Sequence, residues 1–116
     1  MKILSVLLLV FLYTACVKKQ ELTYQINISK DTMVLVLSEL HVSQAGIGIR
    51  GLDADSAERL YNLEKYQILK RYNLTDKRFK ENYNAYLQKV EEMEQIYARV
   101  VDSLGLKETE LSAMEK

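Results

Sequence analysis

An apolar repeat in the C-terminal half of the chain limits the fold more than any other feature. Apolar and aromatic residues alternate four and three positions apart, at Phe79, Tyr83, Tyr86, Val90, Met93, Tyr97, Val100 and Leu104. This spacing lines one face of an α-helix and forms a heptad seam. The chain contains no proline, so no residue of that type interrupts the helix. The repeat predicts one long helix that Gly105 ends, followed by a charged, flexible tail over residues 105–116.

A first helix is expected from about residue 30 to residue 45. Ser29 or Asp31 can serve as its N-cap, and apolar residues cover nearly all its sides, which is typical of a buried helix. The residues 46–51 that follow match the dinucleotide-binding pattern Gly-x-Gly-x-x-Gly. That pattern binds a nucleotide only between a strand and a helix. Here it follows a helix, so we interpret these glycines as a helix end and reject nucleotide binding.

A second helix is expected to begin at Asp55 and to reach about residue 71. Glu58 follows Asp55 at the spacing of a capping box, and Thr75 is placed to cap the third helix. The prediction is an all-α fold, a small bundle of three helices over residues 30–104. Such a bundle buries only a modest core, so docking on a partner or on a second copy would add stability.

The N-terminus has the pattern of a bacterial lipoprotein signal. Lys2 precedes an apolar stretch that is too short to span a bilayer, and the only cysteine, Cys16, follows the small residue Ala15. Such signals direct lipid attachment to the cysteine, which becomes the first mature residue. We therefore predict a signal peptide over residues 1–15, lipid on Cys16 and a tether over residues 16–29. Two alternatives remain: ordinary secretion with cleavage after Ala15, and an apolar stretch retained as an anchor.

The composition argues against several classes of function. Lys and Arg together number 16 and so do Asp and Glu, which leaves no basic field for nucleic acid. One Cys and one His cannot build a zinc cluster, and no metal or cofactor is expected. His41 is the obvious catalytic type, but Glu39 points about 200° round the helix from it. We predict no enzyme, since a site at His41 would need Tyr61 or Asp76 from another helix.

Several segments resemble a known family. They are residues 31–45, which contain Glu39-Leu40-His41; residues 66–75, which contain Arg71-Tyr72-Asn73-Leu74-Thr75; and Phe79, Tyr83, Tyr86 and residues 96–100. Over roughly residues 28–104 the chain resembles the Bacteroidota lipoproteins grouped as domain of unknown function 4296. The resemblance implies Glu39, His41 and Tyr72 as family-motif residues. Relatives usually carry a proline near Val90, so the resemblance favours a bend near residues 88–90 where the repeat favours a straight rod.

The expected function is that of a non-enzymatic accessory or interaction module of the cell envelope. Residues 17–21 lack an aspartate directly after Cys16 and an acidic run, which indicates outer-membrane anchoring with the domain facing the periplasm, and the resemblance implies the same kind of address. A protein partner in the cell envelope is expected. A straight third helix would project beyond the two shorter ones and expose an apolar stripe for that partner or for self-association. The interaction candidates on this stripe are Met93, Tyr97, Val100 and Leu104. Tyr66 is a further candidate, because it is the tyrosine expected at the surface and tyrosine is enriched in interfaces.

Two alternative functions and one modification complete the expectations. The first alternative is a small periplasmic ligand-binding or chaperone-like domain with an apolar groove, and the second is an enzyme or metal site around His41. Asp55-Ser56-Ala57 resembles the Asp-Ser/Thr-apolar acceptor for O-glycosylation in Bacteroidota, and it follows the glycine loop. Ser56 is therefore the candidate modification site.

Overall fold

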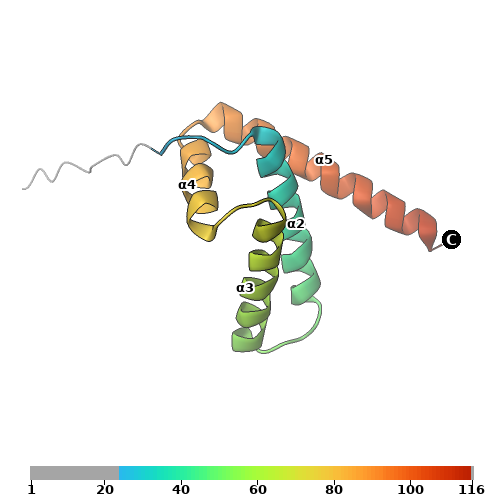
Figure 1. The fold of residues 1–116 in the computed structure, drawn as a ribbon. Coiled ribbons are helices and arrows are strands. Elements are labelled where there is room, and N and C mark those ends of the chain that lie inside the picture. Colours follow the sequence, from blue (N-terminus) through green and yellow to red (C-terminus); the bar gives the residue numbers. More distant parts are fainter. Residues whose placement is uncertain (1–23, 116) are drawn as a thin grey trace, which may run out of the picture.

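The computed structural model describes residues 24–115, which form four helices and no strand (Figure 1). The helices are α2 (Lys30–Gly48), α3 (Ala54–Arg71), α4 (Asp76–Leu87) and α5 (Val90–Met114). The all-α prediction is confirmed, but the number of helices was wrong. Cys16, the predicted signal peptide and the first part of the predicted tether lie outside the described residues. Within the described part of the chain, no helix is both long and apolar enough to cross a membrane.

Side-chain caps start the first three of these helices. The Ser29 hydroxyl accepts a hydrogen bond from the Thr32 N–H at 3.1 Å, and the Thr75 hydroxyl accepts one from the Arg78 N–H at 3.2 Å, as predicted. The cap of α3 is Asp53 rather than Asp55. Asp53 has the extended backbone that an N-cap requires, whereas Asp55 already lies in the first helical turn, where a carboxylate meets the positive end of the helix dipole.

The predicted long third helix is in fact two helices, α4 and α5. Lys89 leaves helical geometry at φ −112° and ψ 80°, and its N–H donates to the Tyr86 carbonyl at 2.9 Å, which closes α4 with a tight turn. The straight rod is therefore wrong, and the bend near residues 88–90 is confirmed without a proline. Packing explains the bend, because the bend allows the apolar faces of both helices to pack on one core. Val90, at the start of α5, is left exposed.

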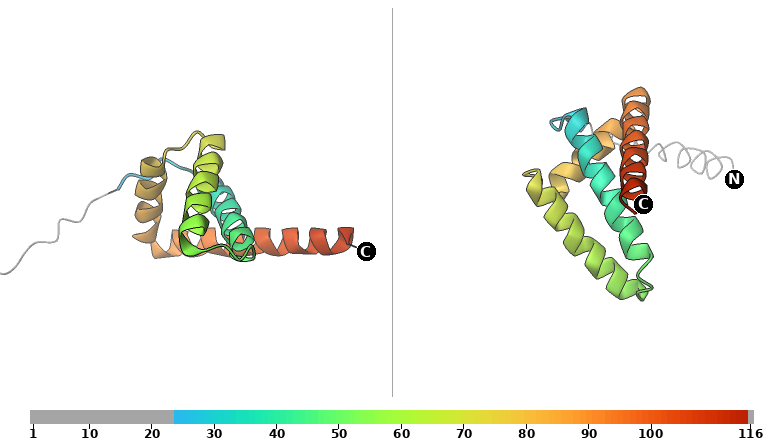
Figure 2. Two further views of the ribbon diagram at one scale, coloured as in Figure 1. Left: turned by 90° about the horizontal axis from the view of Figure 1, so that it is seen from below. Right: turned by 90° about the vertical axis from the view of Figure 1, so that its right-hand side faces the viewer.

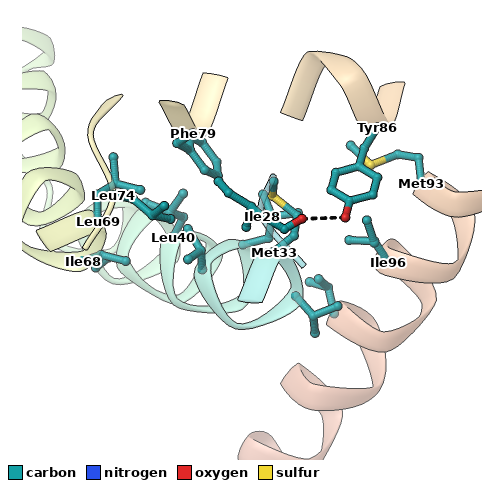
Figure 3. Packing of buried hydrophobic residues seen from close by; sticks show 14 residues of the cluster. Ile28, Met33, Leu40, Ile68, Leu69, Leu74, Phe79, Tyr86, Met93 and Ile96 are labelled. Carbon is teal, nitrogen blue, oxygen red and sulfur yellow. Dashed lines mark hydrogen bonds between the residues drawn. The ribbon is translucent and has the colours of Figure 1, made fainter. Parts of the chain in front are cut away.

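The core is built around α2, which lies between α3 and α5 (Figure 2). Met33 and Val36 on this helix are completely buried. Apolar residues of α3, α4 and α5 belong to the same core, including Leu69, Phe79 and Ile96 (Figure 3). A helix that is apolar on nearly all sides can be stable only when neighbours cover it on several sides, which this arrangement provides.

The expected apolar stripe on the third helix is not exposed where it was predicted. Met93 is 6% and Val100 is 1% exposed, so both belong to the domain's own core. Tyr97 and Leu104 are partly buried and pack against that core. Because the bend turns α5 back across α2, the α5 part of the predicted seam packs within the domain itself. Met93 and Val100 are therefore excluded as a partner surface.

The C-terminal segment is helical rather than an irregular tail. Gly105 lies inside α5, which continues to Met114 and extends beyond the other helices (Figure 1). Thr109 and Ser112 each donate a hydrogen bond to the carbonyl four residues earlier. The prediction that Gly105 ends the helix was wrong, because nothing in the following residues breaks the backbone pattern and one glycine costs a helix only about 1 kcal/mol.

A buried asparagine fixes the segment before α2 to α4. The Asn82 side chain is 1% exposed, and its carbonyl oxygen accepts from the N–H groups of Asn27 (2.7 Å) and Ile28 (2.8 Å). Its amide donates to the Asn27 side chain and to the Arg78 carbonyl. The Tyr86 hydroxyl donates to the Ile28 carbonyl at 2.7 Å (Figure 3). We call this set of contacts the Asn82 clasp.

Candidate functional site

The structure brings two of the three family-motif residues together. The Tyr72 hydroxyl donates to the Glu39 carboxylate at 2.5 Å, and Arg71 forms an ion pair with the same carboxylate. Burial would raise the pKa of the Glu39 carboxyl, but the bonds from Tyr72 and Arg71 and the nearby Lys107 lower it overall. Burial and the Glu39 charge raise the pKa of Tyr72 to about 12. The cluster holds an ionised carboxylate and links α2 to the end of α3.

The third motif residue, His41, lies elsewhere, beside a crevice of about 200 Å³. All four helices contribute to its lining, which consists of Leu37, Leu40, His41, Gln44, Tyr61, Phe79, Tyr83 and Tyr97. The His41 and Tyr97 rings are 6.3 Å apart. The Tyr83 and Tyr97 hydroxyls are hydrogen-bonded at 2.9 Å, and burial together with Tyr83 raises the pKa of Tyr97 to about 12. Tyr97 therefore stays protonated at neutral pH, and aromatic and aliphatic side chains make up most of the crevice lining.

Of the two partners named as candidates for an enzyme site at His41, Tyr61 lines the crevice and Asp76 does not. Asp76 instead binds Lys65 and Lys80, each at 2.6 Å, and these bonds lower the pKa of its carboxyl. Within residues 24–115 no group of three or more His, Cys, Asp or Glu side chains is arranged to hold a metal ion.

A groove between α3 and α4 has a volume of about 560 Å³. It is lined by Asn62, Lys65, Tyr66, Leu69, Lys70, Asn73, Leu74, Thr75, Asp76 and Lys80. Tyr66 is 62% exposed, and the Lys70 ammonium lies 5.9 Å from the centre of its ring. We call this surface the Tyr66 groove. Of the predicted interaction residues, Tyr66 alone combines an exposed side chain with a concave surface.

Ser56 occupies the first turn of α3 and is half-buried. Its backbone N–H donates to the Asp53 carboxylate at 3.0 Å, and the Ser56 side chain and backbone together lower the pKa of that carboxyl. The candidate O-glycosylation site is therefore part of a helix start, and its modification stays a prediction.

The lysines of the Tyr66 groove did not stand out in the sequence. A signal was present, because Tyr66 and Lys70 are four residues apart on one helix, as are Asp76 and Lys80 on the next. Such pairs lie on one helical face. What the sequence could not show is that the two faces meet across the turn at residues 72–75.

Comparison with known sequences identifies the family. No curated protein and no solved structure matches the chain. The family model described as domain of unknown function DUF4296 matches residues 25–110, a range that contains all four helices except the last turn of α5. The chain therefore belongs to the DUF4296 domain family.

Proposed function

We propose that this protein is a lipid-anchored lipoprotein of the cell envelope that faces the periplasm and acts as a non-enzymatic interaction module. A protein partner docks on the Tyr66 groove. The observation that carries the proposal is the exposed Tyr66 ring beside a groove of about 560 Å³. Tyrosine is enriched at binding hot spots, because its ring provides a large contact area and its hydroxyl a polar tip.

The anchoring part of the proposal rests on the sequence. A short apolar stretch ends at Ala15-Cys16, and lipid on that cysteine would hold the domain at a membrane. The test compares the full-length protein with Cys16→Ser in fractionated cells. The native protein is expected in the membrane fraction with the mass of a lipidated chain that begins at Cys16. An unchanged mass and membrane association in Cys16→Ser would refute the anchoring.

The docking part is tested by site-specific cross-linking in intact cells. A photoreactive phenylalanine analogue replaces Tyr66 in the full-length protein. The matched control replaces Leu63, which lies on the same helix and is 54% exposed but does not line the groove. We expect a discrete protein adduct from position 66 and little from position 63. Equal labelling from both positions, or none from position 66, would show that the groove is not the docking surface.

The alternative function, binding of a small ligand, is favoured by the crevice beside His41. Its lining carries three tyrosines and one phenylalanine and no acidic or lysine side chain, which suits a small, uncharged aromatic compound. A screen of such compounds by NMR would show shifts of the His41 and Tyr97 ring signals upon binding. A Tyr61→Trp substitution, which adds bulk to the lining, should weaken binding and reduce these shifts.

A further inference from the structure

We infer that the Tyr66 groove binds an acidic polypeptide segment, with an apolar side chain of that segment against the Tyr66 ring and its carboxylates among the groove lysines. This inference rests on the proposed function and names the chemistry of the partner. Three observations carry it: the charge of the lining, the exposed Tyr66 ring and the place where the basic surface ends.

The lining has an excess of positive charge in a chain whose net charge is zero. Three ammonium groups, those of Lys65, Lys70 and Lys80, face a single carboxylate, that of Asp76. Lys65 and Lys80 share this carboxylate at 2.6 Å each, and Lys70 lies over the Tyr66 ring. One carboxylate cannot neutralise three cations, so the groove attracts further anionic groups, which favours and orients an acidic partner.

The groove also offers an apolar surface. This surface is mainly the Tyr66 ring, since Tyr66 is 62% exposed, whereas Leu69 and Leu74 also line the groove but are only 2% and 8% exposed. An anionic lipid headgroup or a free phosphate would satisfy the lysines but leave this surface uncovered. A polypeptide supplies an apolar side chain between its carboxylates. The side chains of Asn62 and Asn73 at the groove can pair with its backbone amides.

The basic surface ends within α3. The N-terminal half of this helix presents Asp55 and Glu58 in a separate depression, together with Arg59. An acidic segment that extends in this direction meets like charges, which are unfavourable opposite one another. The bound segment is therefore confined to the C-terminal end of α3 and the first turns of α4.

The test uses the photoreactive analogue at position 66 in the full-length, lipidated protein. Mass spectrometry of the adduct identifies the partner peptide that was cross-linked. We expect Asp or Glu residues on both sides of an apolar residue in that peptide. Lys70→Glu combined with Lys80→Glu should lower the yield of adduct about tenfold, because attraction becomes repulsion at two positions. The control is Lys77→Glu, a lysine of α4 whose side chain is 84% exposed and which does not line the groove.

A milder pair, Lys70→Gln with Lys80→Gln, guards against loss of folding, and the melting temperature of each variant is measured. A loss of adduct in a folded variant supports the inference. An adduct with a neutral or basic peptide, or a yield that the folded variants do not change, overturns the inference but leaves docking at the groove intact. An adduct with lipid or glycan alone overturns the inference and also the docking of a protein at the groove. The absence of any protein adduct at position 66 overturns both.

Discussion

Replacing Asn82 with alanine should destabilise the domain by about 3 kcal/mol, since each buried polar group left without a partner costs about 1–3 kcal/mol. Asn82 is 1% exposed and makes hydrogen bonds with both its carbonyl oxygen and its amide. The partners are largely backbone groups of Asn27, Ile28 and Arg78, which remain in place after the substitution.

The magnitude follows from how deeply each partner is buried. The Ile28 N–H lies in a buried site and has no access to water once the asparagine is gone, so it accounts for about 2 kcal/mol. The Asn27 N–H and the Arg78 carbonyl are partly buried and can recruit water, so together they account for about 1 kcal/mol. The Tyr86 hydrogen bond to the Ile28 carbonyl remains and limits the loss.

The assay is urea denaturation of the unlipidated domain, in which the circular-dichroism signal of the helices monitors unfolding. The control is Asn84→Ala, a half-buried asparagine on the same helix, which should change the free energy of unfolding by less than about 0.5 kcal/mol. A loss of about 3 kcal/mol should lower the melting temperature by roughly 12–24 °C in a domain of this size. Hydrogen exchange should show that the Ile28 amide loses its protection.

The reasoning is refuted if Asn82→Ala and Asn84→Ala have the same stability and the Ile28 amide stays protected. Such a result would mean that apolar packing of Ile28, which is 4% exposed, holds the segment in place by itself. The polar clasp would then contribute nothing measurable.

Three further predictions concern the remaining features. In a double-mutant cycle, Glu39→Gln and Tyr72→Phe should show a coupling of about 1 kcal/mol, and additive effects would contradict the link between α2 and α3. Tyrosines have a pKa near 10 in the unfolded chain, whereas Tyr72 and Tyr97 have a pKa of about 12 in the folded domain. The free energy of unfolding should therefore fall as the pH rises from about 10 to about 12. Urea titrations at alkaline pH should show a smaller fall for Tyr97→Phe than for the native protein. Gly51 has φ +65°, which disfavours alanine, so Gly51→Ala should destabilise the domain by about 1 kcal/mol. Gly105 lies inside α5 with open space at its Cβ position, so Gly105→Ala should stabilise the domain by about 1 kcal/mol. Thermal melting measures both changes.

Structural features that depend only on residues close together in the sequence could be predicted from the sequence. The caps at Ser29 and Thr75 and the approximate extents of α2 and α3 follow from local patterns, and all were found close to where they were expected. The cap of α3 was assigned to Asp55 although Asp53 serves, because two aspartates stand two residues apart and local chemistry does not distinguish them.

The bend at Lys89 could not be predicted from the periodicity alone. No local residue breaks the helix; the apolar faces of α4 and α5 are instead drawn onto the same core. Except for the exposed Val90, the residues of the repeat belong to the core or pack against it. The repeat did not indicate their partner, which is this chain's own α2 rather than another molecule. The Asn82 clasp joins positions 54 and 55 residues apart, a separation that no local pattern reports. The family resemblance named Glu39 and Tyr72 as motif residues but did not predict that they meet.

The Asn82 clasp also sets how far the domain can move from a membrane. If lipid is attached at Cys16, eleven Cα–Cα steps connect it to Asn27, where the chain is fixed to α4, and they reach at most about 38 Å. The domain would search a thin layer next to the bilayer, and a partner that resides in or on the same membrane would meet it at a high effective concentration. A weak contact at the groove would then suffice for stable association. Releasing the clasp would lengthen the tether and lower this effective concentration.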